Sequence, residues 1–209
     1  EKVKRYFKVV YAMDFTANWS YPTNIRFGIG RITELADALV WAKINEDANW
    51  ENTPLKIYVS IGTYKPLYSP KDSNFGTDQE RDNSFLMVKN VQVYGGFDPS
   101  NNINTLNDER ILPSTGTNGT ILSADVNNDD GDDFTNNSEN LTRVIVSSSD
   151  AGKALLNGFT ISGANGEYND DITVNGNPIY QCSGAGIYNS ISSPSYENLL
   201  VIGIKMLRY

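Results

Sequence analysis

The chain of 209 residues is 39% hydrophobic and 20% charged, so it can build one ordinary core or one elongated array of repeats. Its 25 acidic and 17 basic side chains give a net charge of -8, which argues against nucleic acid and anionic lipid as natural partners. It contains no histidine and one cysteine, Cys182, which excludes histidine-based catalysis, a cysteine-based metal site and an intrachain disulfide.

The cellular location is indicated only indirectly. No run of about 18 apolar residues is present that could span a membrane. The chain starts at Glu1 rather than Met, as a processed protein does once an export signal or lipid anchor has been removed. We therefore expect a protein that is secreted or held at the outer cell surface.

Residues 1–55 are predicted to hold a strand and a capping helix. The strand is Arg5 to Tyr11, which is followed by Asn, Pro and Gly typical of a loop. The helix starts behind Thr33, whose hydroxyl can cap the first turn. Its apolar stripe at helical spacing consists of Leu35, Ala38, Leu39 and Ala42. Such a stripe must cover apolar surface, and the next strand, Lys56 to Tyr64, is the expected partner.

Residues 56–209 contain short apolar runs bounded by Gly, Asn or Ser and separated by loops of unequal length. The runs are Ile57 to Tyr64, Val91 to Phe97, Thr120 to Asp125, Arg143 to Ser149, Gly158 to Ala164, Gly184 to Ser190 and Leu199 to Gly203. Their spacing varies between about 15 and 35 residues, which favours stacked units with insertions. An immunoglobulin-like sandwich is the alternative, although its strands recur more evenly, at about 8 to 12 residues.

One short rung is written twice. Asn157 and Gly163 repeat Asn90 and Gly96 at the same spacing, within LLNGFTISGANG and VKNVQVYGGF. A rung of this kind cannot bury its apolar face alone, so copies must stack. We expect the asparagines, with Asn198, to occupy left-handed turns in which the side chain bonds the backbone.

Five segments, taken in order, resemble bacterial right-handed parallel β-helix proteins. They are GTYKP (Gly62 to Pro66), VQVYGGF (Val91 to Phe97), TILSAD (Thr120 to Asp125), LNGFTISGANG (Leu156 to Gly166) and GAGIYNSISSPSYENLLVIG (Gly184 to Gly203). They are similar to the pectin-lyase-like surface proteins that share repeats with chlamydial polymorphic outer membrane proteins. The resemblance implies an all-β parallel β-helix with an N-terminal capping helix. We expect six or seven coils, long loops gathered on one face, and a solenoid that is truncated at its C-terminal end.

The segment Asp125 to Asp133 (DVNNDDGDD) is the strongest candidate for a metal site. Asp125, Asn127 and Asp129 match the first, third and fifth ligand positions of a calcium-binding loop, and Asp133 adds a further carboxylate. The turn glycine comes one place late, as Gly131, and no Glu occupies the twelfth position. A bound calcium ion and a solvated acidic turn are therefore both open.

Catalytic residues are harder to assign. Asp170 and Asp171 form the other adjacent pair of carboxylates near a rung, but adjacent side chains usually point apart. A lyase base could only be Lys or Arg, and Lys153, Arg143 and Arg110 lie nearest to predicted rungs. Each of the three is better explained by a structural or solvated role.

Loop tyrosines are the candidates for ligand binding, because aromatic rings stack on the apolar faces of sugars. Tyr68, Tyr168 and Tyr180 lie in predicted loops. The alternative is that these rings pack over the edges of the solenoid.

Two functions fit these patterns. The first is a non-catalytic, adhesin-like scaffold that binds a polysaccharide or cell-surface glycan through loops 65–84, 98–119 and 126–142. The second is a carbohydrate-active enzyme, a polysaccharide lyase that uses calcium, which rests on fold analogy and the acidic segment. A third reading is a fragment whose function lies in further coils. An uncapped last coil would also permit end-to-end self-association.

Overall fold

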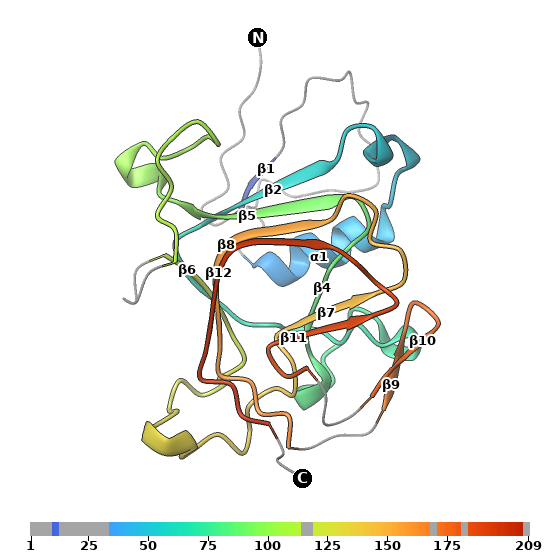
Figure 1. Ribbon diagram of the computed structural model, residues 1–209, viewed down its shortest axis with the longest axis vertical. Coiled ribbons are helices and arrows are strands. Elements are labelled where there is room, and N and C mark those ends of the chain that lie inside the picture. The colour runs from blue at the N-terminus through green and yellow to red at the C-terminus, as the bar shows by residue number, and fades with distance from the viewer. Residues whose placement is uncertain (1–9, 13–33, 114–118, 168–170, 181–183, 207–209) are drawn as a thin grey trace.

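The protein is a parallel β-solenoid of about three turns (Figure 1). Its structure is a computed structural model that describes residues 10–12, 34–113, 119–167, 171–180 and 184–206. The expected all-β parallel β-helix is confirmed as a fold class. The prediction of six or seven coils is wrong, because the solenoid has about three turns. Each turn contains strands on up to three faces, so the apolar runs outnumber the turns by more than two to one.

The strands stack on three faces. The first face contains β2 (Leu55–Ser60), β5 (Val91–Phe97) and the first halves of β8 (Leu155–Ser162) and β12 (Ser195–Ile202). The second contains β3 (Gly62–Tyr64), β6 (Thr120–Ser123) and the second halves of β8 and β12. The third contains β4 (Phe85–Leu86), β7 (Ile145–Ser148) and β11 (Ile187–Ser190). All these pairings are parallel.

Other elements flank the stack. The short β1 (Val10–Ala12) pairs antiparallel with β2 and overlaps the predicted N-terminal strand, whose residues 5–9 lie outside the described part. A hairpin of β9 (Ile172–Val174) and β10 (Asn177–Ile179) was not predicted. The 3₁₀ turns are η1 (Ala48–Glu51), η2 (Asp72–Asn74), η3 (Glu80–Asp82), η4 (Pro99–Asn101) and η5 (Asp132–Phe134).

The predicted helix is α1 (Leu35–Ile44), and its predicted apolar stripe is buried. These residues join the same core cluster as Ile57 and Val59 of β2 and Phe85 of β4, so the helix covers the first turn of the solenoid. The proposed cap Thr33 lies outside the described residues. Glu34 occupies the N-cap position without a side-chain hydrogen bond. No helix in the described part of the chain is long and apolar enough to cross a membrane.

The core runs along the inside of the solenoid. Val93 of β5 and Leu156 of β8 pair in register, and both are buried. On the second face Leu122 and Ile161 do the same, each with 0% exposure. Burying an aliphatic side chain of this size contributes roughly 1.5–3 kcal/mol. Inward residues of successive turns therefore form columns that hold the stack together.

Asn90 and Asn157 do not occupy equivalent positions, which corrects the predicted alignment of the two rungs. Tyr94 pairs with Asn157, so Asn90 lies level with Lys153 of the next turn. Asn90 is left-handed, with φ of 59°, and its Oδ1 accepts a hydrogen bond of 2.8 Å from the Lys153 N–H, as expected. Asn198 is also left-handed, at φ of 50°, but Asn157 lies within the extended strand β8.

The long loops leave the solenoid at two corners, which corrects the expectation that they gather on one face. Residues 65–84 and the acidic segment after β6 both leave between the second and third faces. The segment after β5, described to residue 113, leaves between the first and second faces. The two loops at the shared corner contact each other, because Lys65 Nζ donates to the Val126 carbonyl.

Two glycines allow successive turns to approach at the corner between the first and second faces. Gly158 has a φ of 89°, a conformation that favours glycine. A Cβ added to Gly95 would lie 2.5 Å from the Gly158 carbonyl oxygen. The obstacle is backbone, so a side chain at Gly95 can be accommodated only if two turns separate.

We expect Gly95→Ala to lower the free energy of unfolding by about 3 kcal/mol, because the added methyl group forces the backbones of two turns apart. Urea denaturation followed by circular dichroism measures this loss. Gly186→Ala is the matched control, since its methyl group would meet the half-exposed side chain of Val201, and should cost less than about 1 kcal/mol. Equal losses for the two variants would contradict the proposed corner packing.

We expect the protein to lose stability at alkaline pH because Tyr196 of β12 is partly buried. Its ring packs against the core, and burial raises the pKa of Tyr196 to about 12. An unfolded tyrosine ionises near pH 10. The unfolded chain therefore binds fewer protons between pH 10 and 12, and stability falls as the pH rises through this range. Urea denaturation at several alkaline pH values should show a shallower fall of the free energy of unfolding for Tyr196→Phe than for the native chain. An equally steep fall in the variant would contradict the assignment to Tyr196.

Candidate functional site

The acidic segment forms a closed excursion between β6 and β7. Its base is joined by a hydrogen bond of 3.0 Å from the Leu141 N–H to the Ala124 carbonyl. Within it Asp125 Oδ1 accepts from the N–H groups of Asn128 and Asp129 at 2.6 and 3.3 Å. Asp125 thus folds the first part of the excursion around its own carboxylate, as Asp side chains do in turns.

Three carboxylates meet in this excursion. One oxygen each from Asp125, Asp129 and Glu139 lies within 4.8 Å of the others. The predicted ligands Asp125 and Asp129 are therefore brought together. Asp133 does not belong to the group, and Asn127 is exposed on the same turn.

Glu139 is the member that the sequence pattern missed. It lies beyond the twelfth position at which a calcium loop carries its glutamate, so the expected spacing passes over it. Glu139 approaches Asp125 because the chain returns to the solenoid at this point, where the Leu141 N–H donates to the Ala124 carbonyl. A Glu near the far end of a long excursion was the available signal.

The local charge is strongly negative. Two carboxylates 4.8 Å apart repel by about 1 kcal/mol in water, and by more where solvent is excluded. Burial raises the pKa of Asp130, and the neighbouring charges of Asp125 and Asp129 add to the rise. The excursion therefore favours a positive charge near these carboxylates.

The three predicted tyrosines have different surroundings. Tyr68 is half-buried, packs against the core and donates a hydrogen bond of 2.8 Å to Asp37 Oδ1 on α1. This hydrogen bond is the main cause that raises the pKa of Tyr68. Tyr180 follows the β9–β10 hairpin and is 54% exposed. Tyr168 lies outside the described residues.

Tyr68 lines a shallow groove of about 470 Å³ beside α1. The helix contributes Asp37, Trp41 and Ile44, and Gly76 closes the groove from the segment after β3. Ile44 is 70% exposed at its rim. The groove therefore combines two aromatic residues, an exposed apolar side chain and a carboxylate, and sequence reasoning had found only Tyr68 of this set.

The candidate lyase bases have structural surroundings. Arg110 donates to the Gly95 carbonyl at 2.9 Å and to Asn157 Oδ1 at 2.8 Å, and its guanidinium lies over the ring of Tyr94. Burial lowers the pKa of Arg110, although both terminal nitrogens are engaged as donors. Arg143 is 1% exposed and donates to the Tyr180 carbonyl.

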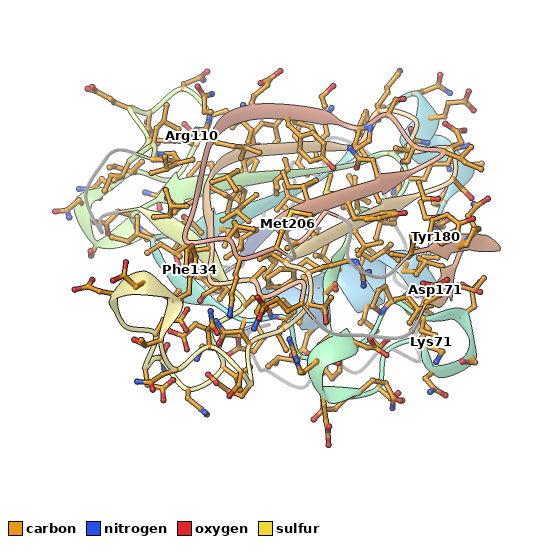
Figure 2. The ribbon with its side chains drawn as sticks, turned by 60° about the horizontal axis from the view of Figure 1, so that its bottom comes forward. Lys71, Arg110, Phe134, Asp171, Tyr180 and Met206 are labelled. Carbon is orange, nitrogen blue, oxygen red and sulfur yellow. The ribbon has the colours of Figure 1, made fainter. Side chains whose placement is uncertain are left out.

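The remaining catalytic candidates are dispersed. Lys153 is exposed on the turn before β8. Asp170 lies outside the described residues, and Asp171 is exposed before β9. Figure 2 shows Arg110 and Asp171 at opposite sides of the molecule, with Phe134 of the acidic excursion at a third position. The structure does not gather these residues into one site.

Comparison of the chain with protein-family models, curated proteins and solved structures found no significant match.

We expect Arg110→Ala to lower the free energy of unfolding by about 2 kcal/mol, because two charge-assisted hydrogen bonds to the first face are lost. Thermal and urea denaturation measure the change. Lys153→Ala, at an exposed position, should stay within about 0.5 kcal/mol of the native chain. If Arg110→Ala were equally neutral, Arg110 would not anchor the segment after β5.

Proposed function

We propose that the protein is a non-catalytic, adhesin-like scaffold that binds a glycan in the groove beside α1. The observation that carries the proposal is the combination of Trp41, Tyr68 and Asp37 in one open groove. Aromatic rings offer the flat apolar surface on which a pyranose packs, and a carboxylate accepts hydrogen bonds from sugar hydroxyls.

The size of the groove supports a small ligand. Its volume of about 470 Å³ falls within the usual range for ligand pockets, about 300–1,000 Å³. The hydrogen bond from Tyr68 to Asp37 fixes one wall to the helix, so less side-chain entropy is lost on binding. The solenoid supplies the rigid frame on which the groove is held.

The cellular setting belongs to the same proposal. The five segments that resemble pectin-lyase-like β-helix proteins favour a right-handed coil and a bacterial protein that is secreted or held at the outer cell surface. Its ligand is then a polysaccharide or a glycan on a cell surface. End-to-end self-association remains a prediction, and β12, which is paired with β8 on one side, would be the strand that mediates it.

A glycan array with the whole chain tests the proposal. We expect a restricted set of glycans to bind, and Tyr68→Leu to weaken that binding about tenfold or more, because one stacking surface and its link to Asp37 are lost. Tyr180→Leu is the matched control, since it removes an exposed tyrosine that does not line the groove, and should bind as the native chain does.

Three outcomes would overturn the proposal. They are an array without binding, a loss of binding with Tyr180→Leu but not with Tyr68→Leu, and turnover of a polysaccharide by the purified chain. Turnover of a uronate polymer would favour the calcium-assisted lyase instead. Circular dichroism of Tyr68→Leu ensures that lost binding is not lost folding, and Asp37→Asn tests the same groove if that variant unfolds.

A further inference from the structure

The two ends of the acidic excursion meet at one place. Asp125 and Asp129 lie at its beginning and Glu139 at its end, and one carboxylate oxygen from each lies within 4.8 Å of the others. Calcium holds oxygen ligands at 2.3–2.6 Å, so two ligands on opposite sides of the ion are about 5 Å apart. The three oxygens therefore fit around a single ion.

Glu139 also has an oxygen that lacks a donor. Its Oε1 is shielded from solvent and has no hydrogen-bond partner among the described residues. A buried carboxylate oxygen without a donor is costly, because nothing replaces the water it has lost. A bound cation would take the place of that water.

Asn140 provides a separate observation that points to a ligand. Its side chain is buried, with 1% exposure, and its Nδ2 donates to both carboxylate oxygens of Asp130, the neighbour of Asp129, at 2.9 Å and to the Gly163 carbonyl at 2.6 Å. The Oδ1 of the same amide has no hydrogen-bond partner in the described part of the chain. Two consecutive residues at the end of the excursion thus carry shielded oxygens without a donor.

We propose that Asp125, Asp129 and Glu139 bind a calcium ion, with Asn140 as a neighbouring oxygen donor. All these groups offer hard oxygen atoms, which suit Ca²⁺ and Mg²⁺ rather than softer metals. Ca²⁺ accepts six to eight ligands in irregular arrangements, whereas Mg²⁺ demands a near-ideal octahedron. An irregular excursion that gathers its ligands from both ends suits Ca²⁺ better.

The ion would act as a structural clasp. It would join the start of the excursion to its end, through residues that lie next in sequence to the hydrogen bond between Leu141 and Ala124 that closes the base. This role goes beyond the proposed glycan binding, which uses a groove on α1, and the two can fail separately.

Isothermal titration of the whole chain with calcium chloride tests the site, without any glycan. We expect one Ca²⁺ per chain and weaker binding of Mg²⁺. Glu139→Gln should weaken Ca²⁺ binding about tenfold or more, because a charged ligand is replaced by a neutral one. Asp133→Asn is the matched control on the same excursion and should change the affinity by less than about threefold.

Limited proteolysis provides a second readout. Calcium should protect the excursion from cleavage in the native chain and in Asp133→Asn, but not in Glu139→Gln. If Glu139→Gln is unfolded by circular dichroism, Asp129→Asn, at an exposed position, replaces it. The proposal is overturned if the native chain takes up no Ca²⁺, if Mg²⁺ binds as well as Ca²⁺, or if both variants lose affinity equally, since the last two results indicate charge screening.

Discussion

The parallel register between β5 and β8 is the constraint on which the rest of the structure depends. Gln92, Val93 and Tyr94 pair with Leu155, Leu156 and Asn157, which places Val93 and Leu156 in the core. A shift of one residue would turn every inward side chain outward. Because β8 continues to pair with β6 on the second face, the same register also fixes where the acidic excursion leaves and where the segment after β5 is anchored. The candidate sites are positioned by this ladder, although none of their side chains belongs to it.

The ladder of paired strands confines insertions to the corners between the faces. A strand within the stack is paired on both sides and carries core residues, so an insertion there would break two rows of hydrogen bonds. At a corner the chain can leave and return if its ends stay close, and the cost of a longer loop grows only slowly with its length. Both candidate sites follow this rule: the acidic excursion closes through Leu141 and Ala124, and the groove lies where the segment after β3 reaches α1.

Local pattern predicted the elements well and their relative positions poorly. The apolar stripe of α1 and the runs that became β2, β5 and β6 are readable because burial imposes helical or alternating spacing on nearby residues. The alignment of Asn90 with Asn157 failed because it matched residue types, whereas register is set by which side chains point inward. The two-residue strand β4 is too short to show a period. Glu139 was missed for a related reason, since its approach to Asp125 depends on a closure between Leu141 and Ala124 that no fixed spacing describes.

The acidic excursion is tied to the next turn of the solenoid through its end rather than its beginning. Asn140 Nδ2 donates to the Gly163 carbonyl at 2.6 Å, directly after β8, and the Asn165 N–H donates to the Leu141 carbonyl. Arg81, from the neighbouring loop at the same corner, donates to the carbonyls of Asn140 and Asn165 at 2.8 and 2.9 Å. Glu139 precedes these contacts by one residue. A cation held by Glu139 would therefore stabilise more than a surface loop, because the residues next to its ligand are the ones that join the second and third turns. The hydrogen bonds that link the end of the excursion to the third turn form a contiguous set. Stabilisation of the excursion can therefore reach the third turn without movement of the core.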